Sequence, residues 1–156
     1  MQFSKDLLSD SEKIFAVEKM TYIDSRTMPE MHYHSHYEIL YVTKNERVLT
    51  LGENDYVLNS ECVALIPPYI PHLTTSGGRY PEERILISFK GDLLVGAEKL
   101  LGKNILYSFD AASPIIMLEE KRDGFCELID LLLRGECAKI DTARLSLRLA
   151  ELLYFL

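Results

Sequence analysis

The stretch "MHYHSHYEILYV", Met31 to Val42, holds three of the four histidines of this chain. Three imidazoles and one carboxylate occupy alternate positions in it: His32, His34, His36 and Glu38. The β-branched and aromatic run that follows predicts a strand. Because side chains alternate across a strand, the four polar groups share one face, which Leu40 and Val42 continue toward a core. The tyrosines at positions 33, 37 and 41 point to the other face. Such a concentration of ligand groups on an inward face predicts a site.

The fourth histidine, His72, lies in "IPPYIPHLT", at the start of another predicted strand. Imidazole nitrogens and a carboxylate oxygen that converge in a cavity suit Zn, Fe, Mn or Ni. The alternative is a hydrogen-bonded polar cluster at the mouth of a barrel, without an ion. Tyr69, beside Pro68, is the best pocket candidate among the tyrosines, which also have the ring type that stacks on a sugar or an aromatic effector.

The bulk composition excludes several classes of protein. A chain of 156 residues, 47% hydrophobic and 26% charged, fits one globular domain. A net charge of -7 without a basic stripe argues against direct nucleic-acid binding. There is no signal-peptide pattern and no long apolar run, so we expect no membrane segment and a cytoplasmic location. Three cysteines without a CxxC pair predict reduced thiols.

From about residue 12 to residue 90 the pattern predicts short strands separated by turns. The clearest are "YEILYV", "RVLTL", the pair within "DYVLNSECVALI", and "RILISF". Short strands without helices between them indicate an antiparallel sandwich or barrel. The polar segment from Thr74 to Arg84 is either a hairpin loop or a lid that carries Arg79 toward an acidic effector.

From about residue 92 to residue 156 the period becomes helical. Helices are predicted in "DLLVGAEKLLG", ending at Gly102, in "FCELIDLLLRG", ending at Gly135, and after Asp141, a good N-cap. The last helix carries an apolar stripe: Leu145, Leu149, Leu152, Leu153 and Leu156. Because the chain ends inside this stripe, we expect the parent chain to continue; the alternative is that the stripe docks on the barrel.

The pattern His32-x-His34-x-x-x-Glu38, followed later by "LIPPYIPH", resembles the two cupin motifs. That resemblance implies four metal ligands: His32, His34, Glu38 and His72. His36 has no place in the pattern. Asn45 stands where the first motif has a glycine, and asparagine tolerates the left-handed backbone that glycine provides. Glu61 stands where the second motif has a glycine, so we expect that turn to differ in shape.

More narrowly, the order of histidines, strands, "IPP…PH" turn and trailing helices resembles the N-terminal sensor domain of AraC-type transcription regulators. The resemblance implies a mainly β fold: a cupin-like antiparallel β-barrel of jelly-roll type over about 12–90, then C-terminal helices over about 92–156. The whole of 1–156 is then one regulatory domain, and a DNA-binding domain is expected after residue 156. The implied effector pocket comprises His32, His34, Glu38, Tyr69 and His72.

The resemblance also implies a homodimer whose interface is the leucine stripe of the last helix. Its charged edge, formed by Arg144, Arg148 and Glu151, suits a helix–helix seam. We therefore expect a non-enzymatic sensor of a small molecule, for which a sugar-like compound is one candidate. The alternative is a small cupin metalloenzyme, an isomerase or dioxygenase, that uses His32, His34, Glu38 and His72. A metal-free sugar-binding module is a third reading.

Overall fold

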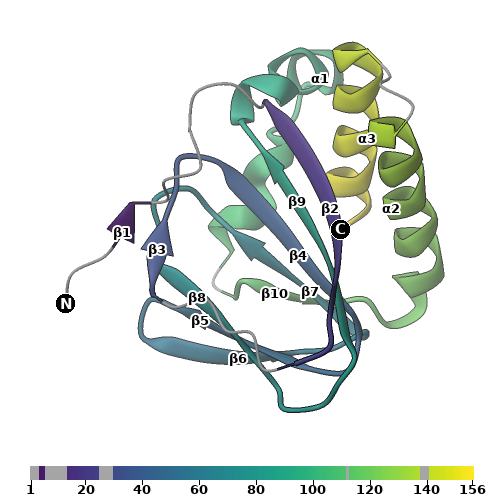
Figure 1. Cartoon of the computed structure of the whole chain (residues 1–156). Helices are drawn as coiled ribbons and strands as arrows, with labels where there is room; N and C mark the ends of the chain where they lie inside the picture. The colour runs from purple at the N-terminus through teal and green to yellow at the C-terminus, as the bar shows by residue number, and fades with distance from the viewer. Residues whose placement is uncertain (1–3, 6–13, 25–29, 112, 138–140) are drawn as a thin grey trace.

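The computed structural model describes residues 4–5, 14–24, 30–111, 113–137 and 141–156. Ten strands form two five-stranded sheets that face each other (Figure 1). One sheet has the order β1-β3-β8-β5-β6: Ser4–Lys5, His32–Tyr33, His72–Ser76, Arg47–Leu51 and Asn54–Leu58. The other has the order β10-β7-β4-β9-β2: Ile115–Met117, Cys62–Ile66, Tyr37–Lys44, Glu82–Phe89 and Phe15–Tyr22. All pairings are antiparallel except that of β1 with β3.

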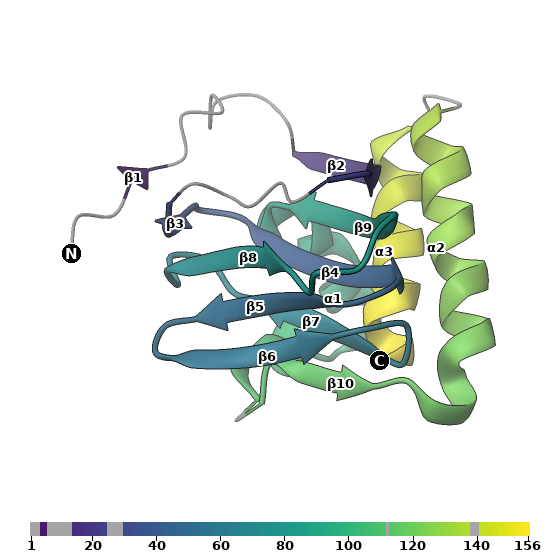
Figure 2. The same cartoon turned by 60° about the horizontal axis from the view of Figure 1, so that its bottom comes forward.

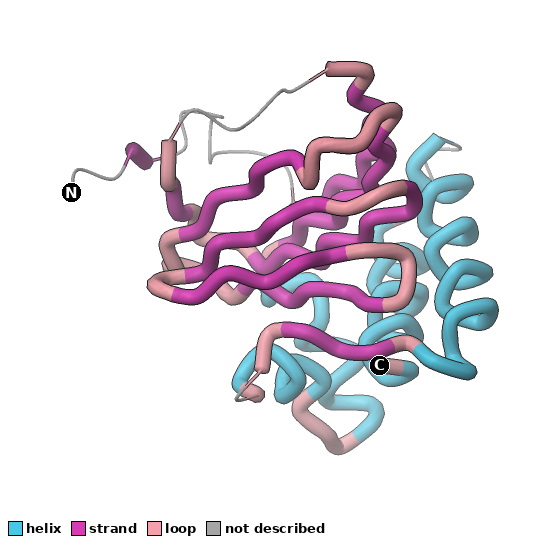
Figure 3. Tube along the Cα trace, turned by 90° about the horizontal axis from the view of Figure 1, so that it is seen from below, coloured by secondary structure: helices cyan, strands magenta, loops and turns pink. Residues whose placement is uncertain are grey.

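Helices follow the last long strand and cover one side of the barrel (Figure 2). The α-helices are α1, Val95–Leu101, α2, Arg122–Cys137, and α3, Thr142–Phe155. Three short 3₁₀ helices precede or separate them: η1, Gly91–Leu94, η2, Ile105–Asp110, and η3, Glu119–Lys121. Seen from below, strands and helices form separate layers (Figure 3).

The predicted helix ends are correct in two cases and wrong in one. Gly102 ends α1 in the left-handed conformation, with φ at 63°. Asp141 caps α3, where its side chain accepts a hydrogen bond from the backbone N–H of Arg144 at 2.9 Å. Gly135 does not end α2, which continues to Cys137. A glycine inside a helix costs only about 1 kcal/mol, which the packing of α2 offsets.

The middle of strand β4 is buried on both faces, which explains why residues 39–42 are apolar without interruption. One face looks into the barrel, where it packs with the other sheet in a first core: Leu40, Val42, Leu49, Leu58, Cys62, Ala64 and Ile66. The other face belongs to a second core between this sheet and the helices, which includes Ile39, Tyr41, Ile87, Phe89, Phe125, Ile129 and Leu132. The histidine stretch therefore opens a strand whose inner face leads into the barrel.

The leucine stripe predicted for a dimer interface lies in this second core. Leu149, Leu152 and Leu153 are fully buried, and Leu145 and Leu156 pack against the same cluster. The sheet has an apolar outer face that must be covered, and α3 covers it. Docking on the barrel, the alternative left open by the sequence, is what the structure shows, and these leucines offer little surface to a second copy.

The segment from Thr74 to Arg84 is mostly strand, not a lid. Strand β8 extends to Ser76 and β9 begins at Glu82, so only residues 77–81 connect them. Arg79 is exposed in this turn. Within the described ranges, no helix has the length and apolar character needed to cross a membrane.

Candidate functional site: a histidine cluster inside the barrel

The barrel strands bring three histidines and one glutamate together. His32 on β3 is paired in register with His72 on β8, and their ring centroids are 4.4 Å apart. His34 lies between β3 and β4, with its ring 4.8 Å from that of His72. Glu38 projects inward from β4. These four side chains are buried, between 2% and 7% exposed. The local sequence therefore folds as its alternation predicts, with the ligand groups turned inward.

The carboxylate of Glu38 is the centre of the cluster. Its Oε1 lies 3.2 Å from Nε2 of His34, and its Oε2 lies 3.5 Å from Nε2 of His72. The hydroxyl of Ser88, on the neighbouring strand β9, donates to Oε1 at 3.4 Å. Burial alone would raise the pKa of Glu38, but the contacts with His34, His36 and His72 hold it well below its ordinary value. These contacts favour the ionised form of Glu38.

Backbone carbonyls determine which ring nitrogen carries the proton. Nδ1 of His34 lies 3.0 Å from the carbonyl oxygen of His36, and Nδ1 of His72 lies 2.9 Å from that of Ile70. A carbonyl oxygen only accepts, so each Nδ1 is the donor. In a neutral imidazole Nε2 then holds a lone pair, and both lone pairs face the carboxylate of Glu38. Electron-rich atoms so close together require a cation between them, either a proton or a metal ion.

Two overlapping sets of three side chains in the cluster could each hold a metal ion: His32, His34 and His72, and His34, His36 and Glu38. Ligands about 2.1 Å from one ion are separated from each other by roughly 3.0–3.4 Å in octahedral or tetrahedral geometry. Glu38 comes close to this range, with Oε1 at 3.2 Å from His34 and Oε2 at 3.5 Å from His72. Within each set of three the ligand atoms lie within 4.8 Å of one another, so a bound ion would draw them closer together. A ligating histidine that donates its other N–H to a carbonyl is the usual outer arrangement of such sites.

Comparison with known proteins identifies the fold that carries this cluster. A family model described as the AraC-like ligand binding domain matches residues 17–153. The chain belongs to this family. Apo ToxT from Vibrio cholerae is similar in structure, with a TM-score of 0.59 at 12% identity over 92% of this chain and 54% of that chain. The chain thus spans about half the length of ToxT. Comparison with curated proteins finds no match.

Cupin structures are also similar over part of the chain. A cupin superfamily protein from Desulfitobacterium hafniense has a TM-score of 0.45 at 15% identity, covering 51% of this chain and 70% of that chain. A cupin 2 conserved barrel domain protein from Salinispora arenicola has a TM-score of 0.45 at 14% identity, covering 51% and 66%. The predicted fold, a cupin-like antiparallel barrel followed by helices, is confirmed.

His36 belongs to the cluster of this AraC-like domain, although the cupin pattern leaves it out. Its Nε2 lies 3.6 Å from Oε1 of Glu38, and its ring stacks on that of His34 with centroids 3.9 Å apart. A quarter of its side chain is exposed, so it lies on the solvent side of the cluster. In "HYHSHYE" His36 continues the every-second-residue spacing of His32 and His34, and this spacing predicts that it faces the same side as they do.

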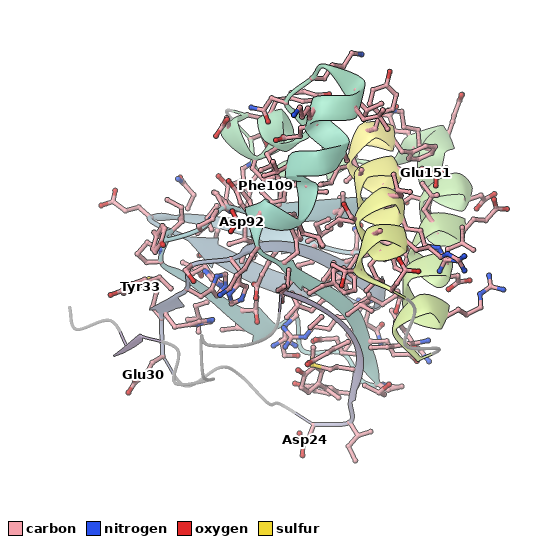
Figure 4. The ribbon with its side chains drawn as sticks, turned by 90° about the horizontal axis from the view of Figure 1, so that it is seen from above. Asp24, Glu30, Tyr33, Asp92, Phe109 and Glu151 are labelled. Atoms are coloured by element: carbon pink, nitrogen blue, oxygen red, sulfur yellow. The ribbon has the colours of Figure 1, made fainter. Side chains whose placement is uncertain are left out.

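Tyr69, predicted for the effector pocket, lies exposed at the surface. Its side chain is 66% exposed, and its φ of 65° turns the chain sharply before β8. Its backbone N–H donates to the carbonyl oxygen of His34 at 2.7 Å, which ties this turn to the histidine stretch. This contact uses the backbone of position 69 and not the tyrosine ring. Figure 4 shows Tyr33 and Glu30 at the rim of the barrel, on the side away from α2 and α3.

A second buried polar cluster in the AraC-like domain escaped the sequence reasoning. Arg47 on β5 forms an ion pair with Glu82 on β9, and both are almost fully buried. Arg84, two residues along β9, donates to the hydroxyls of Thr74 at 3.1 Å and Tyr22 at 2.8 Å. The sequence did contain a signal for Arg84. Ile85, Ile87 and Phe89 form one apolar face of the strand, and the helices cover that face. Arg84 lies on the opposite face, which points into the barrel.

The two predicted turns behave differently. Asn45 adopts the left-handed conformation, with φ at 61°, in the place of the motif glycine, and its side chain donates to the carbonyl oxygen of Pro81 at 2.7 Å. At the second motif, the side chain of Asn59 accepts from the backbone N–H of Glu61 at 2.9 Å, so a side chain shapes this turn. Cys62 and Cys126 are free thiols, and the side chain of Cys137 lies outside the described residues.

Proposed function

We propose that this domain senses a small molecule that binds inside the barrel, beside the histidine cluster, and that it does so within a transcription regulator. The observation that supports this proposal is the cluster of buried, inward-facing polar groups on β3, β4 and β8, in a chain of the AraC-like ligand-binding family. Burying several titratable groups together is costly, and strongly perturbed groups of this kind gather at functional sites in proteins.

Sensing requires two arrangements of the domain with different affinities for the effector. The second core joins the barrel to the helices, because the strands β4 and β9 contribute to both. An effector that contacts the inner face of these strands therefore acts on the packing of α2 and α3 on their outer face. This coupling is the route by which occupancy of the barrel reaches an attached DNA-binding domain.

We further propose that the cluster holds one divalent metal ion. The ligands would be His32, His34, Glu38 and His72. An ion bound there would offer an open coordination site to an oxygen atom of the effector. The same four residues would serve the alternative, a cupin metalloenzyme of isomerase or dioxygenase type. Membership of the AraC-like ligand-binding family supports sensing over catalysis.

Metal content and ligand binding test these two proposals separately. We expect the purified chain, loaded with Zn, Ni, Mn or Fe, to retain about one ion per chain. Glu38→Gln and His72→Ala are expected to lose it, whereas Glu46→Gln, in an exposed turn, keeps it. A chain that stays metal-free after loading contradicts the metal proposal. For the sensing proposal, we expect at least one small molecule to raise the melting temperature of the parent chain but not that of His34→Ala. If no small molecule behaves in this way, the sensing proposal is contradicted.

We also propose that the domain forms a homodimer, but through an exposed apolar face between α1 and α3. Leu100, Leu147 and Tyr154 are 77%, 56% and 58% exposed on these helices. A groove of about 570 Å³ lies along the same helices, lined mainly by apolar residues. Exposed apolar surface of this kind is typical of protein–protein contact, and two-fold symmetry lets the same face serve both copies.

Light scattering after size exclusion tests this interface. We expect Leu147→Asp to shift the chain from dimer to monomer, because a carboxylate in the interface must lose its hydration. Val57→Asp is the matched control: Val57 is 61% exposed on β6, on the barrel, and its variant is expected to remain dimeric. A monomeric parent chain, or a dimer that survives Leu147→Asp, contradicts the proposal.

A further inference from the structure

His36 lies at the solvent side of the histidine cluster. A quarter of its side chain is exposed, compared with 2% for His34 and His72 and 10% for Glu38. Its Nε2 nevertheless lies 3.6 Å from Oε1 of Glu38, the same oxygen that lies 3.2 Å from Nε2 of His34. His36 therefore joins the buried carboxyl group of the cluster to the outside of the barrel.

The cluster offers two overlapping positions for one metal ion. The outer set is His34, His36 and Glu38, and the inner set is His32, His34 and His72. His34 belongs to both sets. Its Nδ1 donates to the carbonyl oxygen of His36, so only its Nε2 has a lone pair for an ion. Because this one nitrogen cannot bind two ions, the outer and inner sets are alternative positions for a single ion.

Glu38 reaches both positions. Its Oε1 lies beside His34 and His36, and its Oε2 lies 3.5 Å from Nε2 of His72. Each oxygen of a carboxylate can accept, so Glu38 can stay in contact with an ion at either position. Exchange between the two positions then replaces His36 by an inner histidine, while Glu38 and His34 stay in place. Since a buried charge without partners is costly, such a stepwise exchange has a lower barrier than complete release.

The ring geometry argues against His36 as a permanent ligand. The rings of His34 and His36 are stacked, with centroids 3.9 Å apart and planes at 8°. An imidazole nitrogen holds an ion in the plane of its own ring, and an ion in the plane of His34 lies outside the parallel plane of His36. His36 can reach such an ion only after its ring turns out of the stack. Its partial exposure leaves room for this turn.

We propose that His36 is an entry ligand: with His34 and Glu38 it takes an incoming metal ion at the solvent side and passes it to the inner histidines. This inference rests on the metal ion proposed above and adds a residue that the cupin pattern leaves out. A ligand that acts only during entry and exit lowers the barrier equally in both directions. It therefore changes the rates of uptake and release by one common factor and leaves the dissociation constant unchanged.

Metal exchange by the purified chain tests the proposal, with Zn²⁺ as the probe. Uptake is followed by stopped flow as the chain removes Zn²⁺ from a weak indicator dye, and release is followed as excess strong chelator removes it again. The dissociation constant comes from competition at equilibrium. We expect His36→Phe, which keeps a ring to stack on His34 but has no ligand nitrogen, to slow uptake and release by about tenfold each. Its dissociation constant is expected to match that of the parent chain.

Two variants serve as controls. Tyr33→Ala removes another ring at the rim of the barrel (Figure 4) and is expected to leave both rates and the dissociation constant unchanged. His72→Ala removes an inner ligand and is expected to lose the ion at equilibrium, a loss that His36→Phe does not share. His36→Ala removes the ring together with its nitrogen and is expected to slow exchange as His36→Phe does.

The other outcomes overturn the proposal, each in a different way. Unchanged rates in both His36 variants would mean that the ion enters by another path. Faster exchange in His36→Ala would make the stacked ring a cover over His34. A weaker dissociation constant with unchanged uptake would make His36 a permanent ligand. A parent chain that binds no Zn²⁺ at equilibrium contradicts the metal proposal itself, and this result is recognised before any His36 variant is compared.

Discussion

Glu82 and Arg47 form an ion pair that is almost closed to solvent, at 0% and 1% exposure. Removing one member of such a pair leaves the other charge buried without compensation. We expect Glu82→Gln to lower the free energy of unfolding by about 3–5 kcal/mol, measured by urea denaturation. The neighbouring Glu83 is the matched control: it meets Lys19 at 3.8 Å and Lys44 at 4.0 Å on the surface. Glu83→Gln is expected to cost less than about 1 kcal/mol, and equal costs would contradict the argument.

The two polar clusters differ in how far the sequence reveals them. The histidines were predictable because three of them alternate within one short stretch, and alternation on a strand places them on one face. Arg47 and Glu82 are separated along the chain by more than thirty residues, and a charged residue on a strand is ordinarily exposed. Their burial depends on strands β5 and β9 facing each other across the barrel, which strand-by-strand reasoning does not contain. The prediction for Tyr69 missed a related feature: its backbone is left-handed and its side chain is exposed, which sequence spacing does not reveal.

Among the elements, α3 was predicted correctly in position and wrongly in role. Periodicity predicts its apolar stripe, but a stripe does not reveal whether it faces a sheet of the same chain or a second copy. The outer face of β4 and β9 determines which of these holds. It carries the apolar residues Ile39, Ile87 and Phe89, and α2 and α3 bury them. The short strand β10, which pairs with β7, was missed because three residues carry too little periodicity to be recognised.

Two glycines test the packing of the helical layer. In α1, a methyl group added at Gly96 meets nothing within 4 Å, so Gly96→Ala is expected to raise the free energy of unfolding by about 0.5–1 kcal/mol. In α2, a methyl group added at Gly124 comes within 2.9 Å of Phe155 on α3. Gly124→Ala must displace this ring and is expected to be at least about 1 kcal/mol less stable than Gly96→Ala. Thermal or urea unfolding of the two variants measures this difference. Equal increases in the free energy of unfolding would mean that α2 and α3 pack more loosely than described.

For the molecule as a whole, the shared strands predict cooperative unfolding. Leu152, fully buried in α3, packs in the core that β4 and β9 share with the helices, while the other faces of these strands form the barrel core. We expect Leu152→Ala to cost about 2–5 kcal/mol. Because barrel and helices form one unit, hydrogen exchange should accelerate by a similar factor in α2 and in the distant strands β5 and β6. Faster exchange confined to α2 and α3 would instead make the helices a separate unit, and would remove the route by which an effector in the barrel reaches them.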